Sequence, residues 1–167
     1  MVKRAALVAI AMVLAGMVWT YAQSSRPTDL LSYEDRVGIE HLYARYNETI
    51  DNGDVDGWVA TWTTDGDFNG FIGREGLRRF AVDYIKNGDG ARRRHWLNNL
   101  AFKATPAGAE VKNYFMILDV SVTPPKVFST GRNVDTFVKT ADGWRFKSRT
   151  TFGSDGKRLS LDQPPTR

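Results

Sequence analysis

The stretch YARYNETIDNGDVDGWVATWTTDGDF, from Tyr43 to Phe68, carries most of the information about the fold that we predict for this chain. Its first half continues an apolar pattern with the 3.6-residue period of an amphipathic helix, and Asn52-Gly53 is a typical helix end. Asp54 then provides a cap for a second, short helix. The stretch therefore predicts a helical hairpin with an aromatic inner face. That face comprises Ile39, Leu42, Tyr43, Tyr46 and Ile50 in the first helix and Val55, Trp58, Val59 and Trp62 in the second.

The flanking sequence adds a helix start and a third helix. Ser32 and Asp35 have the spacing of a capping box, so we expect the first helix to begin there. A turn at Asp65-Gly66 and a short extended piece should lead to a third helix, roughly residues 75–85. Three helices thus precede the rest of the chain.

From Arg92 onward the apolar period changes to two, which is typical of strands. Pro, Gly and Asp residues between the segments supply the turns of an antiparallel meander. Helices followed by strands predict an α+β fold, in which a strongly curved antiparallel sheet wraps the helices as a cone-like barrel with one internal pocket. The four expected strands cover residues 95–103, 110–122, 127–139 and 144–152.

The first 22 residues have the layout of a secretory signal peptide. Lys3 and Arg4 precede an apolar run of 15 residues, Ala5 to Trp19, and small residues lead to Ala22. Such a run is shorter than the roughly 20 residues that span a bilayer, although an uncleaved anchor is the alternative. We expect a periplasmic or secreted protein, with a linker at 23–31, one domain at 32–155 and a disordered tail at 156–167.

Composition excludes several function classes. Two of the four formal net positive charges come from Lys3 and Arg4, so nucleic-acid binding gains little support. The chain has no cysteine, which excludes disulfides and thiolate metal sites. It also lacks HExxH spacing, GxGxxG, a P-loop and GxSxG, so we expect no metal and no cofactor.

Three motifs, in order and spacing, resemble the SnoaL-like branch of the nuclear transport factor 2-like superfamily. They are the stretch at 43–68, RRHWLNN at 93–99 and DGWRFKSR at 142–149. The chain is most similar to the dehydratase, dehydrochlorinase and isomerase group, which uses a pocket Asp and His without a cofactor. The resemblance implies these two roles for Asp51 and His95. It matches Tyr46 to a tyrosine that polarises a substrate oxygen and, more loosely, Arg149 and Asp119 to pocket residues.

The residue types suit proton abstraction. Imidazole gains and loses a proton near neutral pH, so His95 is the candidate base. Asp51 would fix its tautomer and stabilise the imidazolium, and Tyr46 would donate to the oxygen on which charge develops. We expect the substrate, a small apolar molecule, to contact Asn99, Asp119, Arg149, Tyr43 and Trp62.

Each role has a structural alternative. Asp51 would equally serve to end the first helix, and Tyr46 would be an ordinary core tyrosine. Strict alternation groups Arg149 with Arg145 and Lys147 on the outer face, unless a β-bulge turns it inward. Asp119 shares a face with apolar residues and would need a partner.

Two functions from different classes fit the sequence. The first is a cofactor-independent lyase or isomerase that uses the Asp-His pair, and the second is a non-catalytic domain that binds a small hydrophobic molecule or serves in assembly. We also expect a homodimer through the outer sheet face, with Trp96, Leu100 and Phe102 opposite His95.

Overall fold

A computed structural model describes residues 31–87 and 89–159 of this 167-residue chain. The expected signal peptide lies outside the described residues. Within the described part, no helix is long and apolar enough to cross a membrane. The helices are α2 (Tyr33–Asp51), α3 (Val55–Val59), α4 (Gly73–Lys86) and α5 (Asp89–Arg92). The strands are β1 (Trp62–Phe68), β2 (Phe71–Ile72), β3 (Arg93–Thr105), β4 (Gly108–Asp119), β5 (Lys126–Thr140) and β6 (Gly143–Gly153).

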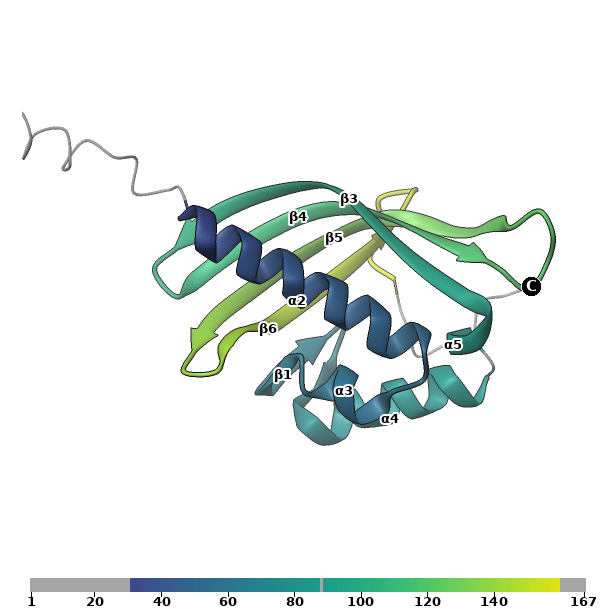
Figure 1. Ribbon diagram of the computed structural model, residues 1–167, viewed down its shortest axis with the longest axis horizontal. Helices are drawn as coiled ribbons and strands as arrows, with labels where there is room; N and C mark the ends of the chain where they lie inside the picture. The colour runs from purple at the N-terminus through teal and green to yellow at the C-terminus, as the bar shows by residue number, and fades with distance from the viewer. Residues whose placement is uncertain (1–30, 88, 160–167) are drawn as a thin grey trace, which may run out of the picture. The chain divides into compact units, whose positions relative to one another are not determined.

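The helix ends follow local sequence. The Ser32 side chain caps α2 by accepting a hydrogen bond from the Asp35 backbone N–H at 3.1 Å. Asn52 ends α2, and Gly53 follows in the left-handed conformation with φ 77°. Asp54 caps α3 by accepting from the Gly57 backbone N–H at 2.8 Å. The predicted helical hairpin is confirmed, and α2 runs across the concave face of the sheet (Figure 1).

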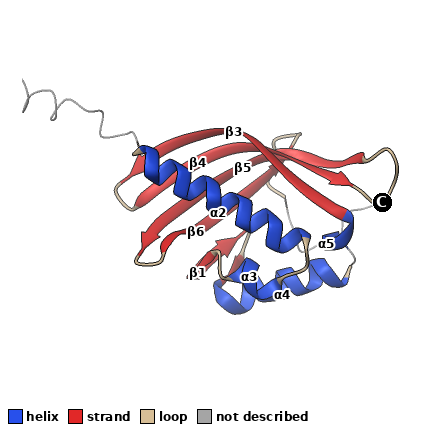
Figure 2. Ribbon diagram, in the orientation of Figure 1, coloured by secondary structure: helices blue, strands red, loops and turns tan. Residues whose placement is uncertain are grey.

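The sheet has six strands in the order β2-β1-β6-β5-β4-β3, with helices on one side (Figure 2). The strands β3 to β6 form the predicted antiparallel meander. The α+β class and the curved sheet are confirmed, but the sheet stays open between β2 and β3 and is no barrel. Trp62, predicted to lie in the second helix, is instead the first residue of β1, which pairs in parallel with β6.

The space between α2 and the sheet is filled by aromatic side chains. Tyr46 packs against Trp58, Trp62 and Phe146, with ring centroids 5.0 to 5.9 Å apart. Phe137 and Phe146 lie beneath, and both are almost completely buried. Aromatic packing is therefore the main feature between α2 and the sheet, and Trp62, expected to contact the substrate, is a core residue.

Two of the β-bulges in the sheet, one in β3 and one in β6, change which side chains face the core. In β3, Asn99 and Leu100 lie opposite the single residue Asn113, and Asn99 adopts a left-handed φ of 52°. After this bulge Leu100 and Phe102 pack against the core, and Asn99 is exposed. Our expectation of Leu100 and Phe102 on the outer face, with Asn99 beside His95, was wrong because a bulge shifts the period by one residue.

The second bulge lies in β6. Phe146 pairs with Phe137 and Ser148 with Thr136, so Lys147 has no partner residue on β5. The extra residue turns Arg149 into the core, where it is 4% exposed, although strict alternation predicted the outer face.

The chain after β6 returns to the sheet. The backbone N–H of Leu159 donates to the Thr151 carbonyl at 2.9 Å, and Arg158 forms a bridge with Phe152. Residues 156–159, which the sequence analysis placed in a tail, thus pair with β6, and residues 160–167 lie outside the described part.

Candidate functional site

Asp51 and His95 form a close pair at the end of α2. One carboxylate oxygen of Asp51 lies 2.6 Å from Nδ1 of the His95 ring. The other accepts the backbone N–H of His95 at 2.9 Å. Because one carboxylate holds both the ring and the backbone of the same histidine, the orientation of the imidazole is fixed and Nδ1 is the nitrogen that faces the acid.

The pair forms where two elements meet. Asp51 is the last residue of α2, and His95 is the third residue of β3. Arg94 donates to the carbonyl of Asp51 at 3.4 Å, and Asn47, one helical turn earlier, donates to the carbonyl of His95 at 3.4 Å. These contacts tie the end of the helix to the start of the strand on both sides of the pair.

The His95 ring lies at the border of the core. Its side chain is 16% exposed, and the Tyr84 ring lies 6.2 Å away, centroid to centroid. The ring forms its hydrogen bond to Asp51 through Nδ1. Nε2 is therefore the nitrogen that a substrate proton would reach, since the other ring nitrogen is occupied by Asp51.

Tyr46 is buried deeper than the pair. Burial raises the pKa of its hydroxyl, and the nearby Arg149 guanidinium opposes that rise. The guanidinium carbon of Arg149 lies 4.4 Å from the centre of the Tyr46 ring. The hydrogen bonds found among the described residues do not join Tyr46 to Asp51 or His95.

A second polar cluster, the buried network, lies under α2 on the concave face. Asp135 is 0% exposed and accepts four hydrogen bonds. Arg149 supplies two of them, from Nε at 2.7 Å and Nη2 at 2.8 Å. Tyr43 donates through its hydroxyl at 2.5 Å and Asn113 through Nδ2 at 3.0 Å. The carboxylate is thus saturated, and Tyr43 and Arg149 are both engaged by it.

The buried network continues across the sheet. Asn133 donates to the side-chain oxygen of Asn113 at 2.9 Å, and Thr151 donates to that of Asn133 at 3.0 Å. Tyr43 and Arg149 were predicted from the sequence to contact the substrate. Asp135, Asn133 and Thr151 were not predicted as site residues. Their signal was present, because Asn133 and Asp135 alternate with the same parity as the apolar Phe137 in β5.

Burial and charge act together on the buried network. Burial and the Asp135 carboxylate raise the pKa of the Tyr43 hydroxyl well above its ordinary value. Burial disfavours the charged guanidinium of Arg149, but the charge and hydrogen bonds of Asp135, together with Tyr46 and Tyr43, outweigh this effect, and the pKa of Arg149 is raised. The Arg149 guanidinium therefore keeps its charge, and Tyr43 is a neutral donor.

Asp119 lies at the end of β4 and has its own partners. Its Oδ1 accepts hydrogen bonds from the backbone N–H and the hydroxyl of Ser121. Its Oδ2 lies 2.8 Å from Nη1 of Arg93. These hydrogen bonds from Ser121, together with Arg93, lower the pKa of Asp119 to about 2. Asp119 thus closes a turn and holds an arginine.

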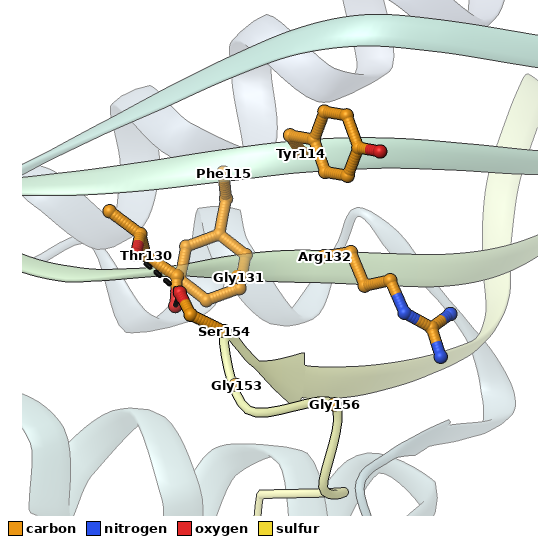
Figure 3. A pocket seen from close by; sticks show the side chains of 8 residues that line it. All are labelled: Tyr114, Phe115, Thr130, Gly131, Arg132, Gly153, Ser154 and Gly156. Carbon is orange, nitrogen blue, oxygen red and sulfur yellow. Dashed lines mark hydrogen bonds between the residues drawn. The ribbon is translucent and has the colours of Figure 1, made fainter.

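A cavity of about 370 Å³ lies elsewhere, beside the middle parts of β4 and β5 and the end of β6 (Figure 3). Neither Asp51 nor His95 lines it. Among the described residues, no three His, Cys, Asp or Glu side chains converge as metal ligands would. The lining residues are Tyr114, Phe115, Thr130, Gly131, Arg132, Gly153, Ser154 and Gly156.

The matched region and the fold define the class of protein. Residues 32–150 match the SnoaL-like domain, and the chain therefore belongs to that family. None of the curated proteins matches this chain.

Solved structures agree with this assignment. Aln2 from a Streptomyces species is 27% identical with a TM-score of 0.69, over 75% of this chain and 95% of Aln2. ActVI-ORFA from Streptomyces coelicolor is 24% identical with a TM-score of 0.66, over 74% of this chain and 98% of that protein. An NTF2-like protein with a cystatin-like fold from Novosphingobium aromaticivorans is also 24% identical, with a TM-score of 0.66, over 74% of this chain and 84% of its own. The fold is thus NTF2-like.

Proposed function

We propose that this protein is a cofactor-independent lyase or isomerase that removes a proton from a small, largely apolar molecule. The observation that carries the proposal is the 2.6 Å contact between Asp51 and Nδ1 of His95. A carboxylate on one ring nitrogen leaves the other free to accept a proton and stabilises the imidazolium that results. The sequence resemblance to the dehydratase, dehydrochlorinase and isomerase group supports the same roles.

The surroundings of the pair suit an apolar substrate. The Tyr84 ring lies 6.2 Å from the His95 ring, and the partly buried Leu97 follows His95 by two residues in β3. A low-dielectric environment strengthens the interaction between Asp51 and the imidazolium that forms during the reaction. Tyr46, whose hydroxyl is buried beside Arg149, would stabilise negative charge only on a substrate that displaces part of the aromatic packing.

A generic probe of a base tests the proposal without knowledge of the natural substrate. A base that removes the C3 proton of 5-nitrobenzisoxazole breaks its N–O bond and releases a coloured cyanonitrophenolate. We expect the wild type to accelerate this reaction and His95→Gln to lower the rate at least a hundredfold, in line with the usual contribution of general bases. His41→Gln is the matched control, because His41 is an exposed histidine. A His95→Gln rate equal to that of the wild type would exclude His95 as the base.

Asp51→Asn separates the acid from the base. The amide keeps the shape but loses the charge, so we expect a slower proton transfer, by at least tenfold, with His95 still present. Unfolding temperatures of both variants would show whether the loss reflects chemistry or folding, since Asp51 also holds the His95 backbone.

A specific observation favours the second candidate, a non-catalytic domain that binds a hydrophobic molecule. Aromatic rings pack against the concave face, and the cavity lined by Tyr114 and Arg132 includes neither Asp51 nor His95. Two results together would support this function over the enzyme. The wild type would bind apolar molecules, and it would open 5-nitrobenzisoxazole no faster than His95→Gln does.

A further inference from the structure

The cavity in Figure 3 is here called the end-of-sheet cavity, because residues at the end of β6 line one side of it. Neither Asp51 nor His95 lines it. Tyr114 of β4 and Arg132 of β5 are directly paired across the two strands and line the cavity together. Gly153 at the end of β6 and Gly156 after it form another wall, and Gly131 of β5 also lines the cavity. Its volume of about 370 Å³ lies within the range of small-molecule sites, which begins at about 300 Å³.

Arg132 brings a positive charge that the described residues leave without a hydrogen bond or ion pair. Its guanidinium carbon lies 4.0 Å from the centre of the Phe152 ring. Stacking on an aromatic ring fixes the plane of the guanidinium, and its N–H groups stay available. A planar guanidinium held in this way is suited to bind a carboxylate through two hydrogen bonds.

The other lining groups are apolar or neutral. The Tyr114 side chain is 55% exposed, and Phe115 lies on the neighbouring position of the same strand. Thr130 and Ser154 join their hydroxyls at 2.6 Å. An exposed tyrosine ring beside one unpaired arginine matches a ligand with a flat apolar part and one negative charge.

The glycine wall brings the backbone close. A Cβ at Gly131 would lie 2.1 Å from the Phe152 carbonyl oxygen and 2.7 Å from the Phe115 ring, so only glycine fits. Gly156 has a left-handed φ of 80° and open space beside it. Gly131 is therefore needed for the close packing of β5 against the Phe152 backbone and the Phe115 ring beside the cavity.

We propose that the end-of-sheet cavity binds small aromatic carboxylates, with the carboxylate on Arg132 and the ring against Tyr114. Arg132 is the one cationic side chain that lines the cavity, which favours a singly charged carboxylate over a phosphate. One guanidinium can bind both oxygens of a carboxylate through two hydrogen bonds. The proposal is independent of the role of His95.

Benzoate is the probe, and benzamide is its neutral counterpart of the same shape. In an NMR titration of the ¹⁵N-labelled protein, we expect saturable shifts of the Gly131, Gly153 and Gly156 amides with benzoate. Benzamide should bind at least tenfold more weakly, since a hydrogen-bonded charge pair contributes about that factor or more. Benzoate affinity should also fall as salt rises.

Arg132→Gln should weaken benzoate at least tenfold and leave benzamide unchanged. Arg79→Gln is the matched control, because Arg79 also stacks on a phenylalanine, Phe71, at 5.6 Å and lies outside the cavity. Arg132 is exposed, so its replacement should not disturb folding. Equal affinities of benzoate and benzamide, no saturable shift at these glycines, or an equal loss in Arg79→Gln would overturn the proposal.

Discussion

Arg149 binds the carboxylate of Asp135 with two parallel hydrogen bonds, from Nε at 2.7 Å and from Nη2 at 2.8 Å, inside the core. Both residues are almost fully buried, at 4% and 0% exposure. The pair can form because the bulge at Lys147 directs the side chain of Arg149, later in β6, to the core face of the sheet. Arg149 therefore serves the buried network first, and the role of substrate contact that the resemblance implied remains a prediction.

Arg149→Met should be strongly destabilising. The variant leaves Asp135 buried with a charge that has lost its counter-ion, and broken buried pairs typically cost about 3–5 kcal/mol. Urea unfolding followed by tryptophan fluorescence measures the free energy of unfolding. Replacing both partners, Asp135→Leu with Arg149→Met, should recover part of the loss because no charge is then left unpaired. A single variant that unfolds within about 1 kcal/mol of the wild type would contradict an ionised buried pair.

Tyr43→Phe should lower the free energy of unfolding by about 1.5–3 kcal/mol, the usual value of a hydrogen bond to a charged group. The Tyr43 hydroxyl donates to Asp135 at 2.5 Å, and a phenylalanine cannot replace that donor. The matched control is Tyr33→Phe, because Tyr33 is 82% exposed and should change stability very little. Equal stabilities of the two variants would exclude a contribution of the Tyr43 hydroxyl.

Asp119 should make the fold more stable above pH 4 than near pH 2. Its pKa is about 2 in the folded chain, against an ordinary value of 3.8. The ionised carboxylate therefore stabilises the folded state fully at a pH above 3.8. This stabilisation is lost as the pH falls through the folded pKa. The difference in unfolding temperature between wild type and Asp119→Asn should therefore shrink from pH 5 to pH 2.

Ser121→Ala is a second test of the same carboxylate, because Ser121 supplies the contacts that lower its pKa most. The variant should lose only part of the difference, since the backbone N–H of Ser121 still donates. The unfolding temperatures of the wild type and of Asp119→Asn could instead change in parallel with pH. That result would show that the pKa of Asp119 is the same in the folded and the unfolded chain.

We propose a homodimer through the outer sheet face, with Trp96 at its centre. Trp96 is 59% exposed on β3. A large aromatic side chain that is exposed in the single chain favours association, because tryptophan is enriched at protein interfaces. Light scattering after size exclusion should give twice the mass of one chain, and Trp96→Glu should give the monomer. Ile72→Glu, at an exposed site on β2, is the control and should stay dimeric. A wild type that stays monomeric at high concentration would refute the proposal.

Local sequence predicted α2 with both of its ends, the start of α3 and the presence of α4. Ser32, Asp54 and Gly53 act through contacts within a few residues, so their roles follow from the chain itself. The order of the motifs pointed to the family, and the match over residues 32–150 confirms it. The pairing of Asp51 with His95 was predicted from the family pattern, since residues 44 positions apart have no local reason to meet.

The side chains that face the core beyond the two bulges could be assigned only from the folded chain. A bulge depends on how two strands pair, and one extra residue sends every later side chain to the other face. Arg149 thus moved inward and Asn99 outward, against their sequence parity. The elements, their caps and the family follow from the order of the amino acids, because local propensity and motif order are sufficient to specify them. The buried network and the end-of-sheet cavity follow from the strand register, because both depend on contacts between residues far apart in the chain.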